Sequence, residues 1–462
     1  MSWEAVVGLE IHVHLKTRTK MFCRCETGFG AESNTHTCPV CLAHPGALPV
    51  ANRTAVEWTI KLGLALGSEI AEQAVFARKN YFYPDNPKGY QISQYDLPLC
   101  LGGKLVVPGD PGFEVGLVRA HLEEDAAKTV HVGGGTGRKV GAERSLIDFN
   151  RGGTPLVEIV TQPDIRSAEQ AERFLQLLRQ TIVTLGISEA RMEEGTLRVD
   201  ANVSVRPAGS DELRTRWELK NMNSFRFIGR GIDAAVREQV KAYESGGDVE
   251  QHTYDYEPDT DTLTPHRAKE EADDYRYFPE PDLVPVRPEA ELVERLRAEV
   301  PESPGERMRR YADELGFERA SELVSNERDR HAEALVANGV AFESAAAFVM
   351  NHDFLLENAA AVAELVEHRS EIPRKTFDEA IAGAGSPGFS AEPYLAQKAV
   401  ADTSALEPIV DEVLAAHPDN VAAYRAGKQG LLGFFVGQVM QKTNGTADAR
   451  VVNELLRAKL DA

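Results

Sequence analysis

Polar and apolar side chains alternate in VVGLEIHVHL, residues 6–15 near the N-terminus. Read as a strand, this segment places Glu10, His12 and His14 on one face and apolar side chains on the other. A carboxylate and two imidazoles at two-residue spacing either face water or lie in a site that needs hard metal ligands.

Three later segments have comparable polar faces. Carboxylates, amides and imidazoles suit Mg²⁺, and lysines and arginines suit phosphates, so the set predicts phosphoryl transfer by positioning and charge neutralisation. The alternation is equally typical of the water-facing side of an antiparallel sheet, and it does not show that the four faces converge. The polar positions are Asp200, Asn202 and Ser204; Arg214, Arg216, Glu218 and Lys220; and Arg119, His121 and Glu123, followed by Glu124 and Asp125.

Four cysteines follow the spacing C-x-C-x12-C-x2-C within CRCETGFGAESNTHTCPVC. Two close pairs separated by a short loop can place four thiolates around Zn²⁺, and a filled site of this kind is structural. His36 and His44 are alternative ligands, and Cys100 is expected to be a buried packing thiol. The predicted ligands are Cys23, Cys25, Cys38 and Cys41.

The elements that must position these residues change in character along the chain. Strand-like runs extend to about residue 287, with helices predicted at 167–186 and 224–247, and this order favours an α+β fold. We predict a mainly antiparallel sheet domain at 1–287 with a zinc-ribbon-like insert at 23–41, an all-helical domain at 288–402 and a small helical tail domain at 403–462. The GGGTG segment at 133–137 lacks a following Gly-Lys-Ser/Thr and predicts a hairpin tip.

The composition is typical of a soluble globular protein, with 42% hydrophobic and 27% charged residues in a chain of 462. No stretch approaches the ~20 apolar residues of a spanning helix, so we expect no membrane contact. The N-terminus has no secretory pattern, and five cysteines do not suggest a disulfide framework. We therefore expect a cytoplasmic protein.

The net charge is −21, from 72 acidic and 51 basic residues. This average argues against a nucleic-acid partner, because phosphate contacts need lysine and arginine. Residues 214–231, however, carry five basic residues and one acid. Because an acidic surface keeps proteins soluble at high internal salt, we expect a halophilic archaeon as the source.

Several segments, in order, carry a family resemblance. The blocks VVGLEIHVHL, FARKNYFYPDNPKGYQISQYDLPL, HLEEDAAK, DFNRGGTPLVEIVTQPDIRS, MEEGTLRVDANVSVRP, ELKNMNSF and DDYRYFPEPDLVPV run through about the first 286 residues. They resemble the GatB/GatE family of aminoacyl-tRNA amidotransferase subunits. The segment GKQGLLGFFVGQVMQKTNG is similar to the C-terminal unit of that family. No large inserted domain precedes the tail, which favours the B-type branch.

The resemblance implies a sheet cradle that uses ATP and Mg²⁺ to activate the side-chain carboxylate of misacylated Asp-tRNA(Asn) or Glu-tRNA(Gln). It also implies assembly with an A-type amidase subunit, which releases ammonia from glutamine, and with a small C-type subunit. The tail domain would contact tRNA. Zinc would support the fold and not the chemistry.

Residues that match the family's positions can be carried over one by one. Lys79, Lys220 and Asn202 are candidates for contacts with the nucleotide, and Tyr81 and Tyr83 would stack on it or on the tRNA end, or serve as core aromatics. His14 stays outside the implied site. Strand phase favours Glu123 as a magnesium ligand beside His121, whereas the motif favours Glu124, and both stay open. The implied catalytic and magnesium positions are Glu10, His12, Glu124, Asp200 and Glu218.

A different class of function is also compatible with the sequence. The chain would then be a non-enzymatic zinc-ribbon scaffold that binds RNA through the basic segment 214–231. The scaffold predicts no ATP turnover that depends on the acceptor tRNA.

The acidic composition generates a prediction about salt. If the protein works at high internal salt, its activity should stay flat or rise between low and molar KCl. An activity assay across that range measures this, and best activity in dilute buffer would contradict the expected source.

Overall fold

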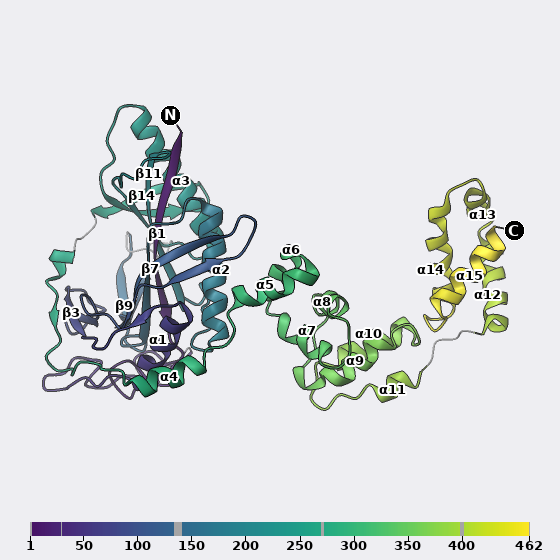
Figure 1. Cartoon of the computed structure of the whole chain (residues 1–462), viewed down its shortest axis with the longest axis horizontal. Helices are drawn as coiled ribbons and strands as arrows, with labels where there is room; N and C mark the ends of the chain where they lie inside the picture. The colour runs from purple at the N-terminus through teal and green to yellow at the C-terminus, as the bar shows by residue number, and fades with distance from the viewer. Residues whose placement is uncertain (1, 29, 134–140, 269–271, 398–401, 462) are drawn as a thin grey trace. The chain divides into compact units, whose positions relative to one another are not determined.

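The computed structural model describes residues 2–28, 30–133, 141–268, 272–397 and 402–461 (Figure 1). The chain packs into two compact units, Met1–Arg309 and Arg310–Ala462. The first unit is built on β-sheets, and the described part of the second contains helices alone. The α+β class is confirmed, whereas the domain boundaries after residues 287 and 402 stay predictions.

A ten-stranded sheet forms the centre of the first unit, in the order β14-β13-β12-β11-β1-β10-β7-β5-β2, with β6 paired to β7. Neighbouring strands are antiparallel except β12 and β13, which run parallel. The mainly antiparallel sheet is therefore confirmed. The strands are β1 Trp3–His14, β2 Glu69–Ile70, β5 Cys100–Leu101, β6 Lys104–Val107, β7 Phe113–Glu124, β10 Pro155–Thr161, β11 Leu197–Pro207, β12 Trp217–Lys220, β13 His252–Glu257 and β14 Thr262–Ala268.

Two long helices, α2 (Ala168–Thr184) and α3 (Phe225–Glu244), pack beside each other and along the sheet (Figure 1). Each begins after a serine whose hydroxyl accepts a hydrogen bond from a backbone N–H three residues later, at Ser167 and Ser224. Gln239 of α3 donates to the carbonyl of Val203 in β11 at 2.9 Å. Both helices lie within the ranges predicted from the sequence. The fully buried apolar positions of β1 include Val7, Leu9, Ile11 and Val13.

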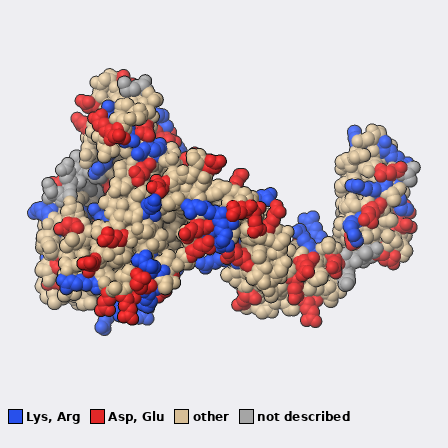
Figure 2. All heavy atoms as spheres, viewed as in Figure 1, with Lys and Arg blue, Asp and Glu red and all other residues tan. Residues whose placement is uncertain are grey.

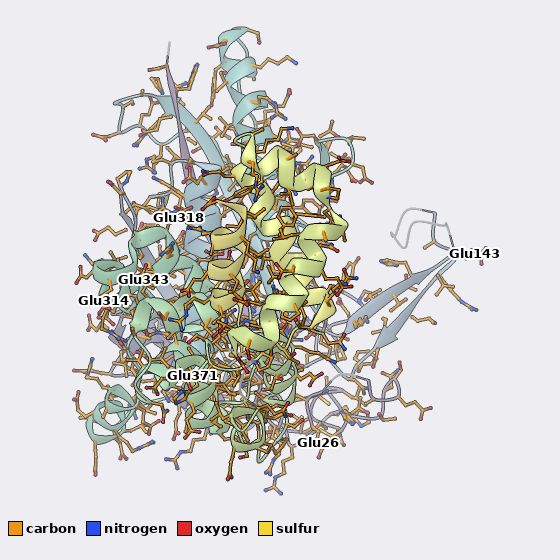
Figure 3. All side chains as sticks on the ribbon, turned by 90° about the vertical axis from the view of Figure 1, so that its right-hand side faces the viewer. Glu26, Glu143, Glu314, Glu318, Glu343 and Glu371 are labelled. Carbon is orange, nitrogen blue, oxygen red and sulfur yellow. The ribbon has the colours of Figure 1, made fainter. Side chains whose placement is uncertain are left out.

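Smaller elements surround the central sheet. β15 (Phe278–Pro279), β3 (Ala77–Asn80) and β4 (Tyr90–Ser93) form a three-stranded sheet, and helices α1 (Arg53–Ala65) and α4 (Ala290–Ala298) pack together. Strands β8 (Lys128–Val132) and β9 (Arg144–Asp148) form a hairpin that projects from the first unit, with Glu143 near its end (Figure 3). Of the predicted GGGTG hairpin tip, residues 134–137 lie outside the described residues.

The second unit continues from α5, and its last four helices, α12 to α15, enclose an apolar core of their own. Val410, Phe435 and Val452 are fully buried members of that core. The helices are α5 Pro304–Leu315, α6 Phe317–Ser325, α7 Asp329–Val336, α8 Phe342–Val349, α9 Ala359–Glu367, α10 Arg374–Gly383, α11 Glu392–Leu395, α12 Thr403–Ala416, α13 Pro418–Arg425, α14 Leu432–Lys442 and α15 Ala449–Leu460.

The surface carries both signs of charge. On the face shown in Figure 2, described acidic and basic side chains are interspersed among uncharged ones, and the acids form separate patches. None of the described helices combines the length and the apolar character needed to cross a membrane.

Candidate active site on the central sheet

Antiparallel pairing brings distant polar residues together. β1 pairs with β11 on one side and with β10 on the other, so Glu10 lies opposite Asp200 and His12 lies opposite Glu158. Glu158 in turn lies opposite His121 of β7. Directly paired residues project to the same side of a sheet. The polar residues of β11, β1, β10 and β7 therefore share one side of it.

A first acidic group surrounds His12. Its Nε2 lies 3.5 Å from Glu123 Oε1 and 3.5 Å from Glu158 Oε2, and ligand atoms of the three residues lie within 4.8 Å of one another. Burial opposes the imidazolium, yet the hydrogen bond to Glu158 and the charge of Glu123 raise the pKa of His12 to about 9. Burial raises the pKa of Glu123 to about 7. At neutral pH the protonated imidazole of His12 therefore compensates the negative charge of the two glutamates. A divalent cation bound by the three side chains could compensate the same charge.

A second acidic group surrounds the ammonium of Lys220. Its Nζ lies 2.9 Å from Asp200 Oδ2 and 3.6 Å from Glu218 Oε1. Glu10 accepts a 3.0 Å hydrogen bond from Asn202 Nδ2, and Asn202 lies opposite Glu218 in the sheet. Burial lowers the pKa of Lys220, but the charges of Asp200 and Glu218 outweigh it and raise this pKa above its usual value. Carboxylates from three adjacent strands thus gather around one cation.

The neighbours Glu123 and Glu124 point in opposite directions, as successive residues of a strand do. The carboxylate of Glu124 pairs with the ammonium of Lys88 and accepts a 2.9 Å hydrogen bond from the backbone N–H of Ile92. It lines a separate cavity of about 200 Å³ beside the cysteine group. Of the two alternatives that the sequence left open, the structure brings Glu123 and not Glu124 next to His12.

A cavity of about 430 Å³ lies over the polar face, and a second one of about 900 Å³ adjoins it. Lys79, Tyr81 and Lys220 line both, and Tyr83 and Tyr275 line the outer cavity alone. Lys79 Nζ lies 4.6 Å from the centre of the Tyr275 ring. These volumes are in the range of small-ligand sites. The first cavity is lined by His12, Lys79, Tyr81, Gln91, Glu123, Asp125, Ala126, Leu156, Arg198, Val199, Asp200, Lys220, Asn221 and Met222.

Asp125 is the buried centre of an ion cluster at the edge of this cavity. Its Oδ2 lies 2.8 Å from His14 Nε2, accepts a 2.6 Å hydrogen bond from Arg198 Nη2 and lies 3.2 Å from Arg151 Nε. Burial alone would raise the pKa of Asp125, but these partners hold it well below its usual value. His14, which the resemblance left outside the site, therefore contacts a residue that lines the cavity.

Sequence reasoning missed Glu158. It is the single ionisable residue of β10, whose sequence is PLVEIVT. A lone carboxylate in an otherwise apolar strand could have marked Glu158 as a candidate. The strand also lies inside the family block DFNRGGTPLVEIVTQPDIRS. Asp125 and Arg198 were missed as partners because their contact joins β11 to the residue just after β7.

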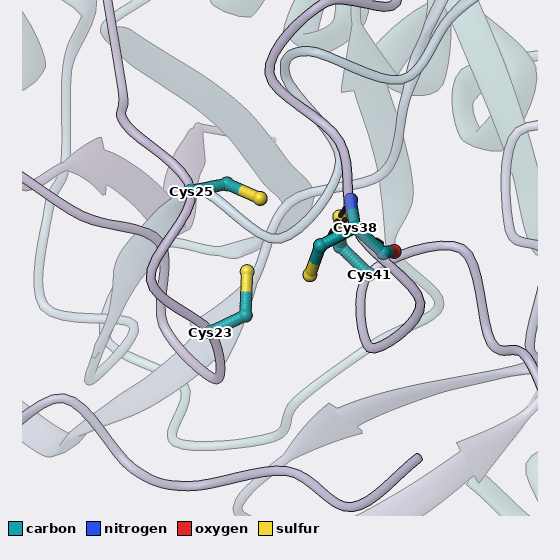
Figure 4. A group of neighbouring side chains, drawn as sticks. All are labelled: Cys23, Cys25, Cys38 and Cys41. Carbon is teal, nitrogen blue, oxygen red and sulfur yellow. Dashed lines mark hydrogen bonds between the residues drawn. The ribbon is translucent and has the colours of Figure 1, made fainter. Parts of the chain in front are cut away.

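Four thiols converge in the first unit, as the cysteine spacing predicts (Figure 4). Their sulfur atoms lie within 4.8 Å of one another, and the group includes neither His36 nor His44. Four thiolates are the donor set of a tetrahedral structural zinc site, so these residues fit that metal. Cys100 is fully buried outside the group. The group consists of Cys23, Cys25, Cys38 and Cys41.

Two acidic groups of the central sheet lie beneath a cavity that lysines line. The carboxylates suit cations and the lysines suit anionic groups, so the protein belongs to the class that binds both in one site. A model of the GatB/GatE catalytic domain matches residues 5–294, and a model of a GatB domain matches residues 356–460. The chain belongs to the GatB/GatE family.

Full-length relatives agree with the family models. The chain is 47% identical to the aspartyl/glutamyl-tRNA(Asn/Gln) amidotransferase B subunit of Anaeromyxobacter dehalogenans strain 2CP-C, over 99% of both chains. It is 45% identical to the proteins of the same name from Geobacter sulfurreducens and Moorella thermoacetica, over 100% of both chains. These organisms are bacteria, so the comparisons do not support the expected halophilic archaeon.

The ion cluster around Asp125 generates a prediction about stability. Asp125→Asn should lower the free energy of unfolding by about 2–4 kcal/mol, because it removes the buried carboxylate that Arg198 and Arg151 share. The native pKa of Asp125 is lowered, so its stabilisation is present above the unfolded-state pKa of about 4 and is lost as the pH falls below it.

Thermal unfolding of the wild type and of Asp125→Asn at neutral pH and below pH 4 measures this effect. The gap in melting temperature should shrink at the lower pH. Asp211→Asn, at an exposed aspartate, is the matched control. An equal gap at both pH values would contradict the assigned role of the carboxylate.

Proposed function

We propose that this chain is the subunit of a tRNA-dependent amidotransferase that activates the side-chain carboxylate of Asp-tRNA(Asn) and Glu-tRNA(Gln) with ATP and Mg²⁺. The observation that carries the proposal is that two acidic groups, around His12 and Lys220, lie under one cavity. The names of the relatives and the family membership support it.

Each group of residues has a proposed role. Mg²⁺ bound by the acidic groups would neutralise phosphate charge during phosphoryl transfer. Lys79 and Lys220 line the cavity and would contact the nucleotide phosphates, while Asn202 holds the carboxylate of Glu10 in place. We assign Glu123 in place of Glu124, because Glu123 lies next to His12 and belongs to the first acidic group. The proposed metal ligands are His12, Glu123 and Glu158 in the first group and Glu10, Asp200 and Glu218 in the second.

The chemistry requires activation because a carboxylate is a poor acyl donor. Transfer of the γ-phosphoryl group of ATP to a side-chain carboxylate oxygen gives ADP and an acyl phosphate. Ammonia then attacks the acyl carbon, phosphate leaves, and Asn-tRNA or Gln-tRNA results. Water would hydrolyse the acyl phosphate, so the reaction needs an enclosed cavity.

Ammonia would come from a partner protein. We propose a heterotrimer in which an A-type amidase subunit releases ammonia from glutamine and a small C-type subunit is the third member of the assembly. The tail at residues 403–462 would contact the tRNA, and the helical domain at 288–402 would join it to the sheet domain. The proposed compartment is the cytoplasm, where thiols stay reduced, and all five cysteines are free thiols.

The scaffold alternative rests on the basic segment 214–231. Lys220 is paired with the carboxylates of the second acidic group, and Arg214 lies over the ring of Tyr243 at 4.9 Å. Arg230 lies 3.3 Å from Asp261. Three of the five basic residues of the segment therefore have intramolecular partners, which weakens the case for RNA binding, and the enzyme proposal is preferred.

Variants of the acidic groups test the proposal in the purified complex. Glu10→Ala, Asp200→Ala and Glu158→Gln should each lower acceptor-dependent ATP turnover by about 100-fold or more, since each removes a proposed metal ligand. Glutamine hydrolysis by the partner should survive. The measurements are ADP release with each misacylated tRNA in turn and glutamate release from glutamine.

The neighbouring glutamates supply a matched pair of controls. Glu123→Gln should abolish turnover, whereas Glu124→Gln should reduce it less than about tenfold, because Gln still accepts from the N–H of Ile92. Wild-type transamidation by Glu10→Ala or Asp200→Ala would overturn the site. Equal effects at Glu123 and Glu124 would overturn the choice between them.

The cysteine group is proposed to hold one structural zinc ion. The purified chain should contain about one zinc, and Cys38→Ser should lose most of it and lower the melting temperature by several degrees. His36→Ala and His44→Ala should keep the metal, because neither imidazole belongs to the group. Elemental analysis measures the zinc content. Full zinc occupancy in Cys38→Ser would contradict the assignment.

A further inference from the structure

Arg198 has no role in the function proposed above, although it lines the same cavity. It lies on β11 directly opposite His12, and two residues before Asp200 on the same face. Its side chain is 42% exposed, so the guanidinium is partly open to the cavity. The residue therefore places a permanent positive charge between the two acidic groups.

One end of this guanidinium is fixed. Nη2 donates to Asp125 Oδ2 at 2.6 Å and lies 3.2 Å from His14 Nε2. Asp125 is itself held by His14 and Arg151. An arginine anchored in this way has already lost its rotamer freedom, so it is preorganised to bind a ligand.

The guanidinium has hydrogen-bonding capacity left. Nε is buried and makes no hydrogen bond to any residue that the structure describes. Arginine carries five N–H donors in a planar fork, and its hydrogen bonds within the described chain all run from Nη2. A buried donor without a partner needs an acceptor, and an oxyanion is the acceptor that matches a guanidinium.

The charges around Arg198 are compatible with a bound anion, because the nearby carboxylates are already paired. The carboxylates of Glu123 and Asp200 contribute to its electrostatic surroundings, but each is already paired, with His12 and with Lys220. In the proposed function these carboxylates hold cations. The positive charge of Arg198 is then balanced by Asp125 on one side alone.

We propose that Arg198 binds an oxyanion of the substrates in this cavity, through the N–H donors that its contacts with Asp125 and His14 leave free. The inference rests on the proposed function. Two sources share the required chemistry, the side-chain carboxylate of the aminoacyl group and a phosphate of the nucleotide. In either case Arg198 is a substrate-binding residue, and Asp125 is a positioning residue that holds it.

The test uses the assembled complex with Arg198→Met and Arg198→Lys. The KM for one substrate should rise by about 10- to 100-fold in Arg198→Met, because a charge-assisted hydrogen bond is lost. A rise for aminoacyl-tRNA identifies the carboxylate, and a rise for ATP identifies the phosphate. Arg198→Lys keeps the charge without the fork, so its KM should lie between those of the wild type and Arg198→Met.

Arg151→Met is the matched control. Arg151 also contacts Asp125, at 3.2 Å, but lines neither cavity. It should leave both KM values within about twofold of the wild type. Melting temperatures and Mn²⁺ affinities of all variants show whether the fold and the acidic groups are intact, and Arg198→Lys serves if Arg198→Met fails to fold.

The outcomes separate the two proposals. Unchanged KM values in both Arg198 variants of an active complex would overturn the role of Arg198 and leave the proposed function standing. An equal KM rise in Arg151→Met would show that the cluster around Asp125 acts only on structure. A wild-type complex without acceptor-dependent ADP release would overturn the proposed function, and the role of Arg198 with it.

Discussion

The register of β1 against its two neighbours is the constraint on which the site depends. Glu10 and His12 have their polar partners Asp200 and Glu158 only because β11 and β10 align with β1 at fixed positions. A shift of one residue would turn every side chain of a strand to the other face, burying carboxylates and exposing the apolar core. Val7, Leu9, Ile11 and Val13 on the apolar face of β1 are fully buried, so the core fixes the register and thereby assembles the polar face.

That polar face has an electrostatic cost. Carboxylates that are taken out of water repel one another and must be balanced by cations or neutralised by protons. Both occur here, since Lys220 lies beside Asp200 and Glu218, and the raised pKa of His12 keeps its imidazole protonated beside Glu158 and Glu123. The side chains of His12 and Lys220 thus supply the positive charge that metal ions would supply in the proposed function.

The sequence shows which residues are polar on one face of a strand, but not which strands meet. Alternation predicts that Glu10 and His12 share one face of β1, as the strand pairing shows, and strand phase favours Glu123 beside His121, where the motif favours Glu124. Glu158 could not be singled out, because its partner His12 lies 146 residues earlier and long-range pairing leaves no local pattern. The grouping of the four cysteines was predictable because their thiols lie within one short segment.

The cysteine loop also supports the site through the backbone. Asn34 donates from Nδ2 to the carbonyl of Ile147, and Met21 donates from its N–H to the carbonyl of Gly153 at 2.7 Å. Gly153 in turn donates to the carbonyl of Asp125 at 2.8 Å, the residue that anchors Arg198. A metal that orders this loop would therefore restrict the turn that precedes β10, and with it the carboxylate at the edge of the cavity. A short series of backbone hydrogen bonds thus joins Met21, two residues before Cys23, to Asp125 through Gly153.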